Sequence, residues 1–262
     1  MNGSFLSSRP NCMLVGAGFT LSIVALLSFG LDPGSTEALL LLDMSGEEQI
    51  FPYPFTIQNI MWALLGIGFG DIIFRQTWSQ KEMLAASNQL LPEDEATIIT
   101  PMEVHALRER VRKAIHYNPG YICTVVEQCL LYFQANRSVE NTHQMMNSMI
   151  DLELHRVDLR YTLLRYLAWL IPTIGFIGTV VGIASALTYL QGGESMSDNM
   201  EAVINSLAMA FNTTILALCF SALLVMLIQF SQKREEDSIN FCSDYCLRNL
   251  INRLYIPKEQ KE

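Results

Sequence analysis

The chain has 262 residues, of which half are hydrophobic and only 16% are charged, and its mean hydropathy is +0.25. Soluble proteins carry about 25% charged residues, so this composition argues against a water-soluble protein and indicates a membrane protein. The formal net charge is -9. The basic residues are balanced by acids and form no dense stripe, which argues against nucleic acid as a partner.

Four apolar runs with few or no charges follow one another, at residues 12–31, 55–74, 167–190 and 203–230. Each reaches the ~20 residues that a helix needs to span ~30 Å of hydrocarbon. The fourth would be ~42 Å long as a helix, so we expect it to project beyond the bilayer. The predicted fold is all-α: a polytopic membrane protein with four transmembrane helices and a helical cytoplasmic region.

The basic residues predict the orientation of these spans. One of the 17 precedes the first run, ten lie between the second and third, six follow the fourth, and neither short connecting loop holds any. By the positive-inside rule, both termini and the middle region are cytoplasmic. The outer loops carry only acids: Asp32, Glu37, Asp43, Glu47, Glu48, Glu194, Asp198 and Glu201. Solvated loops without a role are the default interpretation, although such a rim can concentrate cations.

These features divide the chain into a cytoplasmic N-terminus at 1–10, a membrane hairpin at 11–74 with an acidic outer loop at 32–54, a helical cytoplasmic region at 75–165, the third and fourth spans at 166–232, and a cytoplasmic helical tail at 233–262. An alternative for the N-terminus is a signal peptide cleaved near Gly30. We favour a retained helix, because the apolar run exceeds the usual 7–15 residues and pairs with the second run as a hairpin.

The region at 75–165 is predicted to be helical throughout. Thr100, Pro101 and Glu103 resemble a capping box that opens a helix ending near Asn118. A second helix covers about 121–134. Ser138 would cap a third, which continues without a breaker into the third span. The tail has apolar residues at helical spacing and is expected to prolong the fourth helix.

Cysteines and histidines offer little chemistry. No cysteine lies in an outer loop, and the spacing of Cys242 and Cys246 is not that of a zinc knuckle. The four histidines, His105, His116, His143 and His155, are dispersed. We expect no metal and no cofactor. The sequence has no phosphate-binding glycine loop with lysine, no HExxH and no nucleophile elbow, so it does not suggest an enzyme.

Small residues and hydroxyls share one face of the third span and one face of the fourth. They are Gly175, Gly178, Thr179 and Gly182 in the third, and Ala210, Thr213, Thr214, Ala217 and Ser221 in the fourth. From the residues alone, we favour close helix packing over a conducting surface, because such faces usually bring backbones together. Pro172 lies inside the third span and should bend it.

Residues 172–183 read P-T-I-G-F-I-G-T-V-V-G-I, which resembles the P-L-L-G-L-L-G-T-V-W-G-I signature of the MotA/TolQ/ExbB proton-channel family. Residues 210–218, A-F-N-T-T-I-L-A-L, are similar to that family's A-L-V-T-T-A-x-G-L segment. The resemblance covers roughly 145–235. Two motifs in the right order on adjacent spans are a more specific signal than either alone.

The resemblance implies a channel-forming subunit of a proton- or sodium-driven motor. In this family, five such subunits surround a dimer of a single-span B-type partner (MotB, ExbD or TolR), whose transmembrane helix carries an aspartate. The positions that match the pore hydroxyls are Thr179 and Thr214, with Thr213 beside the latter. Gly175, Gly178, Gly182, Ala210 and Ala217 would pack helices or line the pore.

The distribution of acids agrees with this division of labour. The third and fourth spans contain no carboxylate, so an ion-carrying acid must come from a partner. The only acid inside an apolar run is Asp71, which we expect to pair with Arg75 four residues later. The glutamate that TolQ and ExbB carry five positions before the matched threonine is here Met209, and those relatives have three spans. The driven machine stays open, and the alternatives are a self-contained transporter or a non-conducting scaffold.

Overall fold

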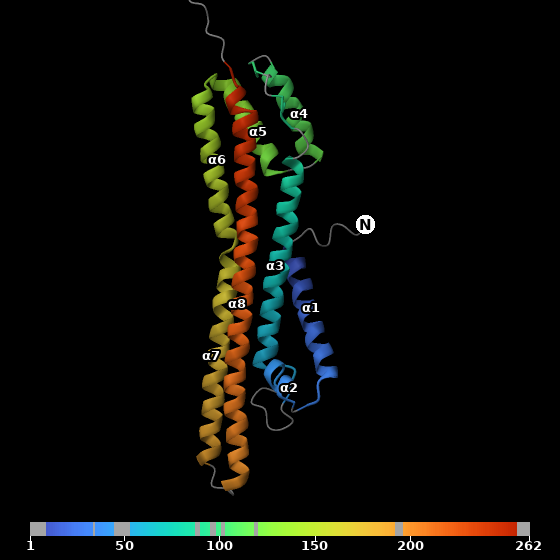
Figure 1. Ribbon diagram of the computed structural model, residues 1–262, viewed down its shortest axis with the longest axis vertical. Coiled ribbons are helices and arrows are strands. Elements are labelled where there is room, and N and C mark those ends of the chain that lie inside the picture. Colours follow the sequence, from blue (N-terminus) through green and yellow to red (C-terminus); the bar gives the residue numbers. More distant parts are fainter. Residues whose placement is uncertain are drawn as a thin grey trace, which may run out of the picture. The chain divides into compact units, whose positions relative to one another are not determined.

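The computed structural model describes residues 9–33, 35–44, 53–86, 90–94, 98–100, 103–117, 120–191 and 196–255. Within them, all regular structure is helical (Figure 1): α1 Arg9–Gly30, α2 Thr36–Leu41, α3 Ile57–Ala86, α4 Glu103–Tyr117, α5 Tyr121–Asn136, α6 Val139–Arg160, α7 Thr162–Gln191, α8 Met196–Asn249 and the short 3-10 helix η1 Ile251–Arg253. Among the predicted features, residues 1–8, Glu47, Glu48, Pro101, Asn118 and Glu194 lie outside these ranges.

Four helical segments are long and apolar enough to cross a membrane, namely Arg9–Gly30, Ile57–Thr77, Val139–Leu190 and Met200–Arg253. The prediction of an all-α membrane protein with four spans is therefore confirmed. The fourth helix, α8, has 54 residues. It extends past the hydrophobic run because the tail residues Ile239, Cys242 and Cys246 continue the same buried helical face.

The chain forms two compact units. Unit 1 comprises Met1–Phe74 and Tyr161–Phe230, and unit 2 comprises Arg75–Arg160 and Ser231–Glu262. The predicted helix from the middle region into the third span is present as a helical segment, Val139–Leu190, with one residue between α6, which ends at Arg160, and α7, which begins at Thr162. The carbonyl of Arg160 accepts a hydrogen bond of 2.6 Å from the guanidinium of Arg75 at this point.

In unit 1, α1 packs against α3 through glycines that allow backbone contact. A Cβ atom on Gly16 would lie 2.2 Å from the carbonyl oxygen of Gly66, and one on Gly70 would lie 2.2 Å from that of Cys12. At the start of α1, Arg9 forms an ion pair with Asp71 across the two helices, with Nε 2.8 Å from Oδ1. This ion pair is a long-range contact, because its two residues are 62 positions apart in the sequence.

The opposite end of this hairpin is closed by α2. Ser35 caps α2 by accepting a hydrogen bond from the Ala38 amide. The free carbonyls at the end of α2 are used by α3: the Thr56 hydroxyl and the Trp62 indole each donate, at 3.1 Å, to Leu42 and Leu41 respectively. Helix ends need such donors when they are buried. Helix α3 in turn meets α8, where Trp62 and Phe220 stack edge to face at 4.7 Å.

In unit 2, α4 packs on α5 and α5 packs on α6. The predicted caps are present: the Glu103 carboxylate accepts from the Thr100 amide at 3.0 Å, and Ser138 accepts from the amide of Asn141 at 3.3 Å. The segment at 90–94 is fixed by Arg253, whose guanidinium donates to the carbonyl of Pro92 at 2.6 Å. These bonds tie a segment without helix to the end of the tail.

Candidate functional site

The three glycines of the third span lie where α7 packs closely against α8. A Cβ atom on Gly175 would be 2.3 Å from the Cβ of Ala217, and one on Gly182 would be 2.8 Å from that of Ala210. One on Gly178 would be 2.6 Å from the hydroxyl oxygen of Thr213. Real Cβ atoms cannot come so close, so these positions need glycine for the observed helix contact. The structure thus brings the predicted small residues of both spans together.

A layer of hydroxyls lies in the same contact, and we call Thr179, Thr213 and Thr214 the threonine layer. The Thr179 hydroxyl lies 3.1 Å from the carbonyl oxygen of Ala210 and is hydrogen-bonded to the hydroxyl of Thr214. Thr214 lies 3.3 Å from the carbonyls of both Gly175 and Ala210. Thr213 donates to Ala210 at 2.9 Å. Three hydroxyls and two main-chain carbonyls therefore converge between the two helices.

The members of the threonine layer differ in accessibility. Thr213 is fully buried, whereas Thr179 and Thr214 are only half-buried and keep one side open. No Asp, Glu, Lys, Arg or His occurs at 166–190 or 202–232. Hydroxyls do not titrate near neutral pH, so the layer cannot carry a proton by itself. Its oxygens can instead accept hydrogen bonds from water or a protonated acid, or replace water around a hard cation.

Pro172 lies within α7, and the helix continues through it. Proline lacks an amide hydrogen, so the carbonyl four residues earlier, that of Ala168, loses its usual donor. The hydroxyl of Ser221 on α8 donates to this carbonyl at 2.8 Å. Sequence reasoning placed Ser221 on the small-residue face but missed this bond, although the i-4 rule for proline identifies the acceptor. The bend at Pro172 stays a prediction.

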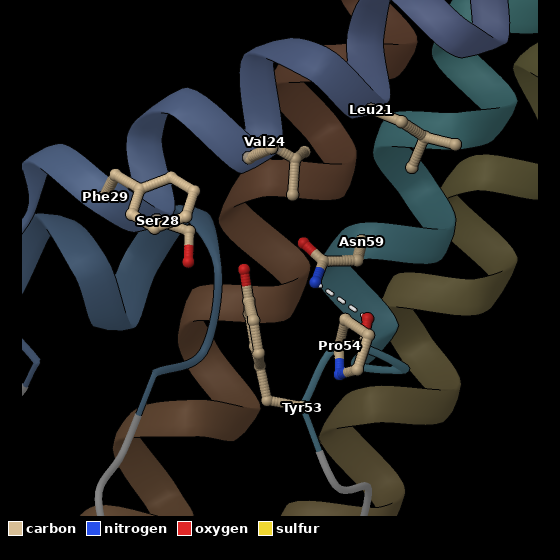
Figure 2. A pocket seen from close by; sticks show the side chains of 8 residues that line it. Leu21, Val24, Ser28, Phe29, Tyr53, Pro54 and Asn59 are labelled. Atoms are coloured by element: carbon tan, nitrogen blue, oxygen red, sulfur yellow. Dashed lines mark hydrogen bonds between the residues drawn. The ribbon is translucent and has the colours of Figure 1, made fainter.

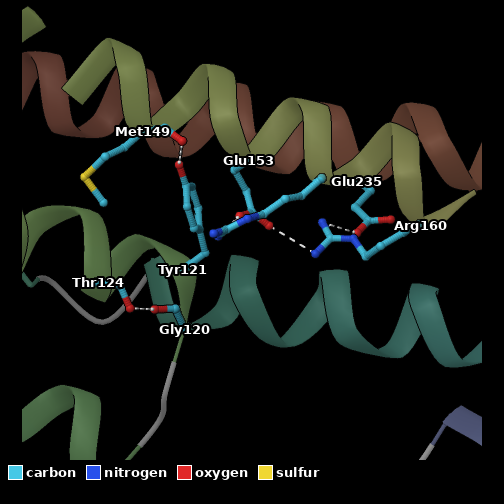
Figure 3. A network of polar contacts seen from close by, with 8 residues as sticks. Gly120, Tyr121, Thr124, Met149, Glu153, Arg160 and Glu235 are labelled. Atoms are coloured by element: carbon cyan, nitrogen blue, oxygen red, sulfur yellow. Dashed lines mark hydrogen bonds and ion pairs between the residues drawn. The ribbon is translucent and has the colours of Figure 1, made fainter. Parts of the chain in front are cut away.

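A second polar cluster, in unit 2, was not predicted at all (Figure 3). Arg160 bridges two buried carboxylates, with Nη1 3.1 Å from Glu153 and Nη2 2.8 Å from Glu235. Arg156 adds a second contact of 3.1 Å to Glu153. The sequence signal is weak, because Glu153 and Arg160 are seven residues apart on one helix face, and Glu235 lies 75 positions further along the chain. This cluster can hold helices in place, but it lies outside the apolar spans.

The buried phenol and thiols of unit 2 have low chemical reactivity. Burial raises the pKa of Tyr121 well above its usual value, and its hydroxyl donates to the carbonyl of Met149 at 3.0 Å (Figure 3). Burial also raises the pKa of Cys129 to about 12. A thiol is a poor nucleophile and a poor metal ligand when its pKa is so high. The described part of the chain contains no cluster of three or more His, Cys, Asp or Glu that could hold a metal ion.

Comparison with known families identifies a matching family. The sequence model of the MotA/TolQ/ExbB proton channel family covers residues 105–242, which is more than half of the chain and includes the threonine layer and all three contact glycines. Comparison with the curated proteins and with the solved structures returned no significant match.

Proposed function

This chain belongs to the MotA/TolQ/ExbB proton channel family, and on that premise we propose that it is the channel-forming subunit of a motor driven by the proton or sodium motive force. Family membership supports a membrane proton-channel role. Members of this family are associated with channels and transport rather than with enzymatic reactions. The proposal adds the mechanical output, the partner and the residues that meet the ion.

One observation carries the proposal: half-open hydroxyls stand in the middle of two spans that hold no ionisable carboxylate. Moving an ion across hydrocarbon needs a group that can exchange charge or replace hydration. Thr179 and Thr214 offer oxygen ligands but no proton of their own. A membrane aspartate on a single-span B-type subunit would supply the missing acid, and the open side of the threonine layer is where it would approach.

The family resemblance also suggests the assembly. We expect five copies of this chain around a dimer of the partner, with the bilayer around the ring. Glycine contacts at Gly175, Gly178 and Gly182 hold α7 on α8, so that the threonine layer is presented by a fixed pair of helices. From the same resemblance we expect a bacterial inner-membrane protein. The distribution of Lys and Arg favours both termini and unit 2 in the cytoplasm.

The first experiment replaces the open hydroxyls without changing side-chain volume. Thr179→Val and Thr214→Val should leave the complex assembled but abolish ion flux in proteoliposomes under an imposed gradient of protons or sodium. The matched control is Thr188→Val, because Thr188 is an exposed residue of α7 whose hydroxyl donates only to its own helix, to Ala184 at 3.0 Å. Normal flux in both valine variants of the threonine layer would contradict the proposal.

The second experiment is co-purification from mild detergent. A small protein with one membrane helix that bears an aspartate should accompany the chain. Replacing that aspartate by asparagine should stop the ion flux. If the chain conducts without any partner, it is a self-contained transporter. If it assembles with no ion-driven activity under any gradient, it is a scaffold whose small-residue faces only pack helices.

A further inference from the structure

A cavity of about 340 Å³ lies between the end of α1 and the beginning of α3, away from the threonine layer (Figure 2). Its walls are mostly apolar and include Leu21, Val24, Ala25 and Phe29 of α1. The polar groups are Ser28, Tyr53 and Asn59. The volume falls in the range of ~300–1,000 Å³ that small-molecule sites occupy, so it has room for a headgroup and the top of an acyl chain but not for a whole lipid.

Asn59 provides this cavity with a hydrogen-bond acceptor that lacks a donor. The residue is only 5% exposed, and its Nδ2 donates to the carbonyl of Pro54 at 2.8 Å. The carbonyl oxygen of Pro54 can accept a hydrogen bond from the amide nitrogen of Asn59 but not from the amide oxygen. This bond therefore fixes which end of the side-chain amide is Nδ2 and which is Oδ1. The other atom, Oδ1, is buried, has no hydrogen-bond partner and faces the cavity, away from Pro54, in Figure 2. A buried acceptor without a donor is destabilising, so a ligand that donates to it would bind more tightly.

The position of the cavity relative to the bilayer indicates which kind of ligand it can bind. Arg9 and Asp71 mark one end of the α1–α3 pair, and Ser28 lies 19 residues further along α1. At ~1.5 Å per residue, Ser28 is ~28 Å from that end, which is close to the ~30 Å thickness of the hydrocarbon. The cavity is therefore at the level of lipid headgroups, with its apolar wall on the side of the acyl chains.

The charge around the cavity selects the headgroup. No Lys or Arg occurs between Arg9 and Arg75, whereas Asp32, Glu37 and Asp43 lie in the described part of the connection between α1 and α3. We propose that the cavity binds a phospholipid whose headgroup ends in a primary ammonium, with the ammonium donating to Asn59. A lipid without a cation in its headgroup would carry a net negative charge into an acidic loop and would leave Oδ1 without its charged donor.

The test uses the full-length protein in mild detergent and native mass spectrometry, with dioleoyl phosphatidylethanolamine and dioleoyl phosphatidylglycerol as probes. The wild-type protein should retain the ethanolamine lipid at least about tenfold more tightly than the glycerol lipid, the factor expected for one charge-assisted hydrogen bond. Asn59→Leu should abolish this preference. Ala25→Leu, which fills the cavity and leaves every polar group in place, should weaken the binding of both lipids.

The control is Ala184→Leu, the same change at an exposed position of α7, and it should bind both lipids as the wild type does. Thermal unfolding of each variant shows whether it is folded. If Asn59→Leu does not fold, Ala25→Leu still tests the proposal. Equal retention of the two lipids by the wild-type protein would overturn the proposal. So would wild-type binding by both cavity variants, or an oligomer that binds neither lipid because a neighbouring copy fills the cavity.

Discussion

Replacing Gly175 by alanine should push α7 away from α8. The added methyl group would lie 2.3 Å from the Cβ of Ala217, and the next nearest atom, the carbonyl oxygen of Thr213, would be 3.2 Å away. The clash is therefore with one methyl group. Overpacking of this kind costs about 1–3 kcal/mol, partly offset by the ~1 kcal/mol by which alanine exceeds glycine in helix propensity. We expect a net loss of up to about 2 kcal/mol in the free energy of unfolding.

The compensating change is Ala217→Gly, which removes that methyl group from α8. In the double variant, one alanine and one glycine have exchanged helices, so the propensity terms cancel and the clash disappears. The double variant should thus recover most of the stability that the Gly175→Ala variant loses, with a coupling free energy of about 1–3 kcal/mol. Gly18→Ala is the control, because a Cβ there meets nothing within 4 Å.

The assay is equilibrium unfolding of the purified protein in mixed micelles with increasing SDS, followed by far-UV circular dichroism. Effects of independent sites add to within about 0.3–0.5 kcal/mol. If the two single changes add within that margin, the helices do not approach each other at Gly175, and the geometry on which the threonine layer depends is wrong.

Three further outcomes follow from particular contacts. Ser221→Ala should lower the free energy of unfolding by about 1 kcal/mol in the wild type. The loss should be smaller in a Pro172→Ala background, where the backbone amide at position 172 can again donate to the carbonyl of Ala168. Equal losses in SDS titrations would refute the role of Ser221 as the donor that replaces this amide. Burial raises the pKa of Asp43 from 3.8 to about 6. The native state then holds more protons than the unfolded state in this window, so stability should fall by on the order of 2 kcal/mol as the pH rises from about 4 to about 6. Asp43→Asn, which tolerates the positive φ of 56°, should remove this dependence in thermal melts at both pH values. Arg160→Met should cost about 3–5 kcal/mol, and adding Glu235→Met should recover part of it; no recovery in thermal melts would argue against the buried pair.

The spans could be predicted because hydrophobicity is a local property of the sequence. Each of the four runs became a helix, although α1 ends at Gly30, inside its run, and α3 begins at Ile57, inside its run. Helix α8 gained much of its extra length from the tail that begins after Phe230. The caps at Thr100 and Ser138 follow from residues three positions apart. Side-chain chemistry next to its own backbone needs no knowledge of the tertiary structure.

The partners across helices could not be predicted in the same way. The local rule for Asp71 pointed to Arg75, and no local rule could point to Arg9, which the structure places against the same carboxylate. Pairing over 62 positions depends on which faces of α1 and α3 meet, and this is decided by Gly16 and Gly66, whose closeness no periodicity reveals. The threonine layer was predicted as residues, but its carbonyl partners only appear once α7 and α8 are packed.

The hydrogen bonds of the threonine layer have a consequence for what can approach it. Each hydroxyl has one hydrogen, and those of Thr179 and Thr214 are directed to each other or to the carbonyls of Gly175 and Ala210. Toward the open side the layer then presents lone pairs and carbonyl dipoles, so its surface potential is negative. We expect it to attract a neutral carboxylic acid, a hydrated proton or a bare cation and to repel a carboxylate. An acid that releases its ion here would be driven off the same surface that had held it.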